Sequence, residues 1–439
     1  MQNPPQFSGP AQEAIELYLN TRKSLFITGK AGTGKSTLLE AIRRYKMPNT
    51  VVLAPTGVAA LNVQGETIHS FFKLKPGYEL DEAKNVRVSP RMQKAFASLD
   101  TILIDEISMV RADILDAIDV LLKRCRNSNE AFGGVRIILF GDLYQLPPVI
   151  KEEQKDTFLQ QFKSPYFFDA HVFEPADLFS EPFELHRIEL TEVFRQTERQ
   201  FINALNAIRE GNVADEHLAV INDRVDQVFI PKKEEQCIYL MTTNYAVNRL
   251  NQAELNKIAA PEWHYKAIRQ GNIGSIQPNE EAITVKKGAQ IMFITNHPEK
   301  RWVNGSLGTI LDQEEIIDED SGQPIKGLRI KMENGQEELV TPYTWEISKY
   351  MFKNGRFRRE ALGFFTQLPL RLAWAVTIHK SQGKTFDKVI IDLNKGSFAH
   401  GQTYVALSRC RSLQGTVLRK PVHYSDIIVD AQITEYMMR

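Results

Sequence analysis

Short apolar runs alternate with amphipathic segments through the first third of the chain. The apolar runs lie at residues 24–29, 51–55, 101–106 and 135–142. Such runs are typical of strands that are buried on both faces of a parallel sheet. One amphipathic segment begins at Lys35, and another, at 109–125, puts four apolar residues on one helical face: Ile114, Ile118, Leu121 and Leu122. Strands that alternate with helices predict an α/β fold with helices on both faces of the sheet.

A second α/β pattern occurs later in the chain and is interrupted. It begins with an apolar run at 237–244 and a helical segment, and it continues at 388–393, 401–409 and 416–420. The interval between has short alternating strands and the hairpin signal Asn334-Gly335. We therefore predict that residues 246–362 are a small β-barrel inserted into the second domain.

The same patterns predict the domain boundaries. Residues 1–175 form the first α/β domain, and residues 70–99 interrupt it as a small insertion. Residues 176–245 and 363–439 form the second α/β domain around the barrel.

Composition narrows the class of protein. The 439 residues include no apolar stretch long enough to span a membrane and no targeting pattern, which predicts a cytoplasmic location. Three widely separated cysteines indicate reduced thiols, so any metal takes oxygen ligands. The 54 basic and 54 acidic residues cancel, and nucleic-acid binding therefore requires a local basic track. Residues 73–99 and 351–360 are candidates, although a solvated charged surface is the simpler explanation for each.

A phosphate-binding loop is the most specific motif in the chain. Residues 29–36 fit GxxxxGK[ST], directly after a predicted strand and before a predicted helix. In such a loop the backbone N–H groups and the lysine bind phosphates, and the hydroxyl binds Mg²⁺. The predicted contacts are Gly29, Ala31, Gly32, Thr33, Gly34, Lys35, Ser36 and Thr37.

Two adjacent carboxylates follow the third apolar run. Such a pair is unfavourable at a buried strand end unless it meets a cation or water. We predict that Asp105 holds Mg²⁺ and that Glu106 polarises the attacking water. Gln145, after the fourth run, is a candidate sensor of the terminal phosphate. Arg195 and Arg409 are candidates for stabilising charge on the transferring group, although most arginines are surface partners of carboxylates.

The ordered set of motifs resembles superfamily 1 DNA helicases. It comprises GKAGTGKS, VVLAPTGVAA, GETIHSFF, ILIDEISMV, GDLYQLPPV, TEVFRQ, LPLRLAWAVTIHKSQGKTFD and GQTYVALSRC. GETIHSFF and LAWAVTIHKSQG are most similar to the petite-integration-frequency helicases, which are relatives of RecD. The resemblance runs from about residue 7 to 420 and has gaps in both insertions.

The resemblance implies two RecA-like domains that bind ATP and Mg²⁺ between them. It implies that residues 70–99 are a strand-separating wedge and that the inserted barrel has an SH3-like fold. It assigns Gln12 to adenine recognition. It assigns these residues to the nucleotide: Lys35, Ser36, Asp105, Glu106, Gln145, Arg195, Gln382, Gly383 and Arg409.

The resemblance also implies contacts with DNA. The residues are Pro55, Thr56, Gly57, His69, Ser70, Thr377, His379 and Lys380. Phe71, Phe72 and Tyr78 lie beside basic residues and could stack on unpaired bases, but core packing explains Phe71 and Phe72 equally well. His69 and His379 could equally be structural histidines.

The predicted function is an ATP-driven motor that moves along single-stranded DNA and parts duplex or folded junctions, acting as a monomer. The resemblance implies that it travels 5′-to-3′. Two alternatives stay open at this point. One is a nucleotide-switched binding protein without motor activity, and the other is an RNA motor. ATPase activity measured with and without single-stranded DNA separates the first alternative from the motor.

Overall fold

The computed structural model describes residues 7–45, 47–75, 79–85, 87–175, 182–232, 235–274, 276–317, 322–394 and 396–439. The chain divides into two compact units. The first unit contains residues 1–194, 348–360 and 430–439, and the second contains 195–347 and 361–429. Among the described residues, no helix has both the length and the apolar character that a membrane crossing requires.

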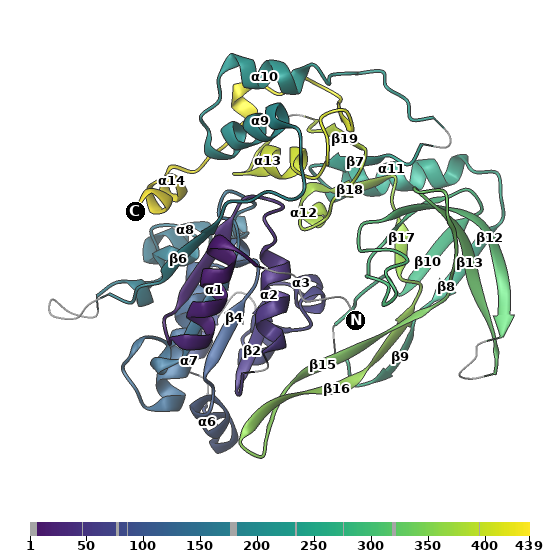
Figure 1. Cartoon of the computed structure of the whole chain (residues 1–439). Helices are drawn as coiled ribbons and strands as arrows, with labels where there is room; N and C mark the ends of the chain where they lie inside the picture. Colours follow the sequence, from purple (N-terminus) through teal and green to yellow (C-terminus); the bar gives the residue numbers. More distant parts are fainter. Residues whose placement is uncertain are drawn as a thin grey trace. The chain divides into compact units, whose positions relative to one another are not determined.

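A six-stranded parallel sheet organises the first unit (Figure 1). Its strands, in spatial order, are β3 (Glu66–Thr67), β2 (Thr50–Ala54), β4 (Thr101–Ile104), β5 (Arg136–Phe140), β1 (Leu25–Gly29) and β6 (His186–Leu190). The four predicted strands are confirmed as β1, β2, β4 and β5. Every neighbouring pair is parallel, so the carboxyl ends of all six strands meet at one edge of the sheet.

Helices cover both faces of this sheet, as predicted. The chain passes from β1 through α2 (Lys35–Arg44) to β2 in one direction along the sheet, and from β4 through α7 (Ala112–Arg126) to β5 in the other. Right-handed crossovers in opposite directions place the two helices on opposite faces. The remaining helices of this unit are α1 (Gly9–Asn20), α3 (Gly57–Asn62), α4 (Ile68–Phe72), α5 (Glu79–Asn85), α6 (Pro90–Ala97), α8 (Glu152–Gln161) and α14 (Ala431–Met438).

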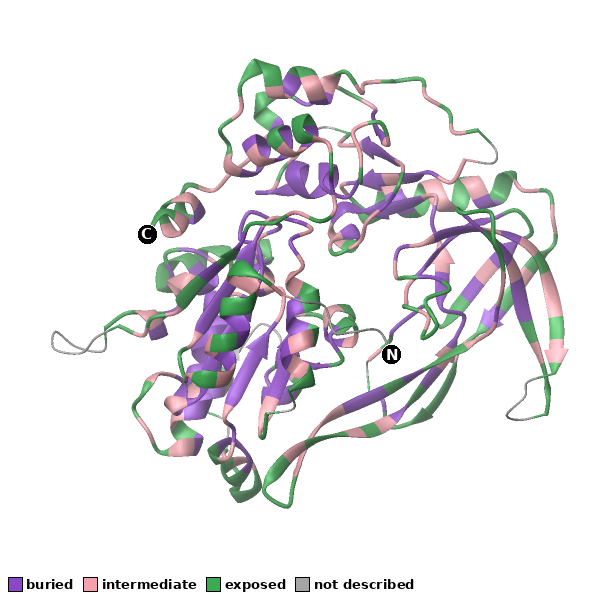
Figure 2. Ribbon diagram, in the orientation of Figure 1, coloured by how far each residue is buried: buried purple, intermediate pink, exposed green. Residues whose placement is uncertain are grey.

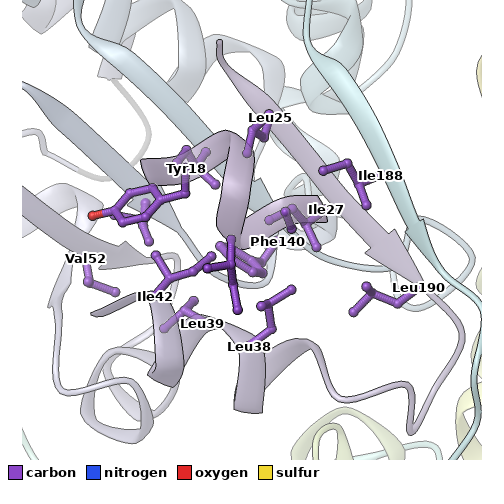
Figure 3. Packing of buried hydrophobic residues seen from close by; sticks show 14 of the residues in the cluster. Tyr18, Leu25, Ile27, Leu38, Leu39, Ile42, Val52, Phe140, Ile188 and Leu190 are labelled. Carbon is purple, nitrogen blue, oxygen red and sulfur yellow. The ribbon is translucent and has the colours of Figure 1, made fainter. Parts of the chain in front are cut away.

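The core beneath α1 and α2 fixes the start of the phosphate loop. Figure 3 shows Leu38 and Ile42 of α2 close to Phe140 of the sheet. Leu38, Ile42, Ile27 and Phe140 are each 0% exposed. Full burial of one such side chain contributes about 1.5–3 kcal/mol, so β1 and α2 are held firmly on either side of the loop.

The insertion at 70–99 contains the helices α5 and α6 in the part that the structure describes. Helices α5 and α6 both pack against α7. Arg126 of α7 holds the C-terminal end of α6 through hydrogen bonds. Its Nη1 donates to the carbonyls of Phe96, Ala97 and Leu99 at 2.7–2.9 Å. Residues 76–78, which include Tyr78, and residue 86 lie outside the described residues.

The compact units differ from the predicted domain boundaries in three places. Strand β6 lies beyond the predicted end at 175, but it pairs with β1 and so belongs to the first sheet. Residues 348–360 and 430–439 also belong to the first unit. Tyr350 Oη accepts from the N–H of Val52 at 3.0 Å, and Tyr436 of α14 stacks on Phe168 with ring centroids 4.2 Å apart.

A smaller parallel sheet organises the second unit. Its strands, in spatial order, are β18 (Ala375–Thr377), β7 (Ile238–Met241), β19 (Val389–Asp392) and β20 (Thr416–Leu418). Its helices are α9 (Arg199–Glu210), α10 (Asp215–Asn222), α11 (Asn244–Lys257), α12 (Ile378–Ser381) and α13 (Gln402–Leu407). Figure 2 shows that the strands of this sheet are mainly buried, while the outer faces of α10 and α11 are largely exposed.

The predicted β insertion is present and begins after α11. Its strands form three antiparallel sheets. They are β8 (Glu262–Lys266), β9 (Ile268–Gly271), β10 (Ala282–Lys286), β11 (Gln290–Phe293), β12 (Leu307–Ile317), β13 (Pro324–Met332), β14 (Glu337–Val340), β15 (Tyr343–Lys353), β16 (Arg356–Gln367) and β17 (Leu370–Leu372). The hairpin predicted at Asn334-Gly335 joins β13 to β14, and Gly335 has the positive φ, +82°, that this turn requires.

Candidate functional site

The phosphate-loop motif forms a tight turn between β1 and α2. Gly32 and Gly34 have φ of +81° and +86°, a region that glycine enters without strain. Gly34 is the N-cap of α2, so the backbone N–H groups of the first helical turn lie at the loop. These N–H groups and the helix dipole together favour an anion at this point.

Close packing against β6 fixes the shape of the loop. A Cβ atom on Gly29 would lie 2.5 Å from the carbonyl oxygen of Leu190 and 2.8 Å from Oγ1 of Thr33. The N–H of Phe194 donates to the carbonyl of Gly32 at 2.9 Å. The loop is therefore held by the chain that follows β6, which the sequence did not indicate.

Lys35 lies inside the turn. Its Nζ donates to the carbonyl oxygens of Gly29 at 2.6 Å and Lys30 at 3.0 Å. Ser36 and Thr37 are exposed on the first turn of α2, whereas Ala31 is buried. The ammonium is thus placed where phosphate oxygens bound by the loop could accept hydrogen bonds from it.

The acidic pair stands at the carboxyl end of β4. Burial and then the charge of Glu106 raise the pKa of Asp105 to about 7, while the charge of Lys35 acts in the opposite direction. Glu106 has φ +52°, a left-handed conformation that is uncommon for a residue other than glycine. Strained backbone of this kind concentrates at functional sites.

Gln145 lies on the same edge of the sheet, after β5. It is 6% exposed, and its Nε2 donates to Oδ2 of Asp142 at 3.2 Å. A Cβ atom on Gly141 would come within 2.7 Å of Cγ2 of Ile107, so the chain after β5 packs directly on the turn that follows Glu106. Gly141, which precedes Gln145 in the same segment, therefore lies against the turn that follows the acidic pair.

Gln12, which the resemblance assigns to adenine recognition, and Phe194 both lie in the first unit. Gln12 is exposed on α1, where its Nε2 donates to Oε1 of Glu16 at 2.9 Å. Phe194, which the sequence analysis did not single out, is 67% exposed, and its ring lies 3.9 Å from where a Cβ on Gly34 would be. The only sequence signal for Phe194 was one aromatic residue in the polar segment TEVFRQTERQ.

Arg195 and Arg409 both contact Ser408 in the second unit. Arg195 Nη1 donates to the carbonyl of Ser408 at 3.0 Å. Arg409 is 1% exposed, and its guanidinium donates to Val405 O at 2.8 Å, to Ser408 Oγ at 2.7 Å and to Lys384 O at 3.3 Å. The structure therefore gathers two arginines that lie far apart in sequence around one turn.

Gln382 and Gly383 adjoin the same turn. They precede Lys384, whose carbonyl Arg409 contacts, and Gly383 is exposed with φ +77°. The predicted nucleotide residues thus fall into two sets: one in the first unit around the phosphate loop, and one in the second unit around Arg409.

Threonine side chains cap the short helices that carry the predicted DNA contacts. Thr56 Oγ1 accepts from the N–H of Ala59 at the start of α3, and Thr377 Oγ1 accepts from Lys380 at the start of α12, each at 3.2 Å. Pro55 is half-buried, whereas Gly57 is exposed with open space beside its Cα. Thr377 itself is 4% exposed, so its side chain serves the helix cap.

His69 and Ser70, two of the predicted DNA contacts, lie in the short helix α4, and Ser70 is exposed. Ser70 Oγ donates to Oε1 of the buried Glu66 at 2.5 Å, and His69 is half-buried. The expectation that Phe72 contacts DNA is corrected: Phe72 is 1% exposed and packs against Phe96, with ring centroids 5.3 Å apart. Core packing is therefore the better explanation for this ring.

Around α12, His379 is half-buried and Lys380 is exposed. Burial lowers the pKa of His379, which favours its neutral form. The carboxyl end of the neighbouring strand β7 has a similar cap, since Thr243 Oγ1 accepts from Ala246 at the start of α11. Tyr245 lies on the first turn of α11 and is 77% exposed. The sequence analysis missed it, although the segment TTNY follows β7 in the same way that PTGV follows β2.

The parallel sheet, the glycine-rich turn and the acidic pair define a P-loop nucleotide-binding fold. A family model described as PIF1-like helicase matches residues 11–218. The ATP-dependent DNA helicase Pif1 of Campylobacter jejuni is 32% identical over 411 residues, which cover 88% of this chain and 86% of the relative. The chain therefore belongs to the PIF1-like helicase family, which confirms the resemblance.

Other relatives agree over most of the chain. The ATP-dependent DNA helicase PIF1 of Danio rerio is 34% identical over 414 residues, which cover 92% of this chain but only 60% of that protein. Unliganded Pif1 from Bacteroides sp has a TM-score of 0.86 at 33% identity, with 99% of this chain and 97% of that chain covered. Bacteroides Pif1 bound to ssDNA has a TM-score of 0.67 at 34% identity, with coverage of 99% and 97%.

Proposed function

We propose that the protein is an ATP-dependent DNA helicase that couples ATP hydrolysis to movement along single-stranded DNA. The observation that carries this proposal is the phosphate loop with Lys35 inside it, together with the Asp105-Glu106 pair at the end of β4, the strand on the far side of β5, where the charge of Lys35 acts on Asp105. A protein that only binds nucleotide has no need of a second carboxylate held in strained backbone. The solved structures of Bacteroides Pif1 in complex with ADP-AlF4 and of Bacteroides Pif1 bound to ssDNA support the same ligands here.

The donor set suits a nucleotide with Mg²⁺. Burial and mutual repulsion make the charged form of Asp105 unfavourable, and a bound cation would relieve both effects. Asp105 and the exposed hydroxyl of Ser36 would hold the ion, which would neutralise phosphate charge. Lys35 and the loop N–H groups would bind the terminal phosphates, and Glu106 would orient and polarise the attacking water.

Residues of the second unit would complete the reaction. Arg195 and Arg409 already lie around one turn, together with Gln382 and Gly383. Closure of the two units on ATP would bring this set to the phosphates, and opening after hydrolysis would release it. Gln145 would sense the terminal phosphate, and Gln12 would recognise the adenine.

Exposed groups at the carboxyl edges of both sheets would hold the strand. Thr56 and Gly57 would offer a phosphate a hydroxyl and free N–H groups, and Lys380 would supply charge. Tyr245 would stack on an unpaired base. We further propose that travel is 5′-to-3′, that residues 70–99 act as the wedge, and that the β insertion is an SH3-like module over the DNA. Action as a monomer is part of the proposal, although one related structure is described as two coordinating Pif1 helicases at forked dsDNA.

The test is ATP hydrolysis with and without oligothymidine, followed by unwinding of a duplex with one single-stranded tail. A helicase hydrolyses ATP faster when the oligonucleotide is present and parts the tailed duplex only with ATP. Comparison of 5′ and 3′ tails gives the direction, and an equivalent RNA tail tests the RNA alternative. Nucleotide binding without DNA-stimulated turnover would refute the motor and favour a nucleotide-switched binding protein.

A further inference from the structure

Three basic side chains of the second unit gather where the β insertion meets the parallel sheet. Arg371 lies in β17, Lys384 follows α12, and Arg409 follows α13. Arg409 Nη1 donates to the carbonyl of Lys384 at 3.3 Å, and Lys384 Nζ donates to Oδ1 of Asn304 at 2.8 Å. Arg371, Lys384 and Arg409 are called the cationic cluster below.

The cluster is electrostatically unfavourable by itself. Burial, then Arg371, then Arg409 lower the pKa of Lys384 to about 8. Burial also lowers the pKa of Arg371, and only the charge of Glu280 opposes this. Nε of Arg371 is buried and has no hydrogen-bond partner within the described part of the chain. A buried donor left in this state is costly, so such a group points to a ligand or a function.

The ammonium of Lys384 is held in place rather than merely enclosed. A Cβ atom on Gly305 would lie 3.4 Å from Cβ of Lys384, so the turn at Asn304-Gly305 packs along the lysine stem. Asn304 accepts one hydrogen bond from an ammonium that has three to give. Gly383, directly before Lys384, is exposed and has open space beside its Cα. An anion could therefore approach the lysine from the side of Gly383.

We propose that the cationic cluster, with Asn304 as the positioning residue for Lys384, binds a phosphate group. A phosphate carries the negative charge that the cluster lacks and accepts several hydrogen bonds, and a guanidinium and an ammonium suit it equally. The nucleotide and the DNA backbone both present this chemistry. The nucleotide is the expected source, because Lys384 is anchored to Arg409. The proposal therefore rests on the nucleotide role proposed for Arg409.

The experiment compares Lys384→Met, Lys384→Arg and the control Lys388→Met. Lys388 lies four residues further along and forms an ion pair with Glu235, so the control removes a lysine of the same region outside the cluster. Binding of ADP, a non-hydrolysable ATP analogue and oligothymidine is measured by equilibrium titration, and the melting temperature is measured for each variant.

Lys384→Met is expected to weaken binding of the ATP analogue by about tenfold, the lower end of what a hydrogen bond to a charged group contributes. ADP binding should change little, Lys384→Arg should retain most of the affinity, and the control should behave as wild type. The melting temperature of Lys384→Met should be unchanged or raised, because methionine keeps the stem and removes the repulsion. If Lys384 instead stabilised the fold, Lys384→Met would lower the melting temperature.

The outcomes separate the two sources and the underlying function. If Lys384→Met weakens the binding of oligothymidine alone, the cluster does bind phosphate, and the DNA backbone supplies that phosphate. Unchanged binding of all three probes, or a lowered melting temperature with equal losses in every probe, overturns the proposal. These measurements test binding and not hydrolysis. If the wild-type protein failed to hydrolyse ATP, the proposed motor would be refuted, but the binding results would still show whether the cationic cluster binds phosphate.

Discussion

At the scale of single residues, the two carboxylates after β4 have separate predicted tasks. Glu106→Gln is nearly isosteric and removes only the charge that polarises water, while Ser36 and Asp105 stay in place. We expect nucleotide and DNA binding within a few-fold of wild type and turnover reduced by roughly 10²–10⁴, the usual worth of a general base. Steady-state hydrolysis and nucleotide titration measure the two effects.

The backbone at Glu106 provides the control for this variant. Its φ of +52° is one that asparagine adopts more readily than most residues. Glu106→Asn therefore keeps the turn, removes the charge and shortens the side chain. It should fold as well as wild type and also fail to turn over. Near-normal hydrolysis by either variant would show that Glu106 is not the residue that acts on the water.

Lys380 tests the predicted DNA track through salt dependence. Its side chain is exposed at the carboxyl edge of the second sheet. Each phosphate that a protein neutralises releases counterions, so affinity falls with salt in proportion to the number of contacts. Lys380→Ala should weaken oligothymidine binding and reduce the slope of log affinity against log salt by about one. Titrations at several salt concentrations give the slope, and a slope equal to that of wild type would remove Lys380 from the track.

At the scale of elements, the hairpin tip at 348–360 is held on the first unit by a buried carboxylate. Glu66 is 5% exposed and accepts from Ser70 Oγ at 2.5 Å and from the N–H of Tyr350 at 2.7 Å. Burial raises the pKa of Glu66 more than these hydrogen bonds lower it. A carboxyl whose folded pKa is raised favours the folded state when protonated, so this contribution to stability is lost as pH rises through the folded pKa.

Glu66→Gln removes that pH dependence. A glutamine can accept from Tyr350 through its oxygen and donate to Ser70 through its nitrogen, because the serine hydroxyl can reverse its role. At neutral pH we expect stability equal to wild type or about 1 kcal/mol higher, with a smaller loss between mildly acidic and neutral pH. Denaturant unfolding at several pH values measures this, with Glu40→Gln at an exposed position of α2 as the control. A marked destabilisation at neutral pH would mean that the ionised carboxylate is needed.

The insertion at 70–99, with its exposed arginines, gives a second prediction at this scale. Arg87 and Arg91 are exposed, and Arg91 lies in the first turn of α6, where positive charge is unfavourable to the helix dipole. Replacing both by alanine should therefore leave folding intact. If the insertion parts the duplex, unwinding should fall several-fold more than DNA-stimulated hydrolysis, because hydrolysis needs only a single strand. Parallel assays on tailed duplex and oligothymidine decide this, and equal losses would place these arginines on the strand track instead.

At the scale of the whole molecule, local patterns predicted most of the fold. The apolar runs gave β1, β2, β4 and β5 because each is buried on both faces, and the phosphate loop followed from spacing alone. Strand β6 was missed because it lies at a sheet edge, and its residues, HRIEL, alternate between exposed and buried positions. The sequence contains no local signal that Tyr350 packs on β2, or that Arg195 reaches the carbonyl of Ser408. Those contacts depend on how distant segments fold together.

Arg409 carries the prediction that depends on both units. It is anchored within the second unit by Val405, Ser408 and Lys384, whereas Lys35 and the acidic pair lie in the first. The first unit would bind ATP with its own groups, and Arg409 would add charge mainly when closure brings it to the transition state. Arg409→Ala should therefore keep nucleotide affinity within about tenfold but lower turnover by roughly 10³ or more, with little remaining stimulation by DNA. Arg409→Lys should rescue poorly because it lacks the planar fork of donors. Since Arg409 is 1% exposed, melting temperatures must accompany the assays, and Arg195→Ala is the comparison, because Arg195 contacts the same turn through the carbonyl of Ser408. Strong DNA-stimulated turnover by a folded Arg409→Ala protein would refute the composite site.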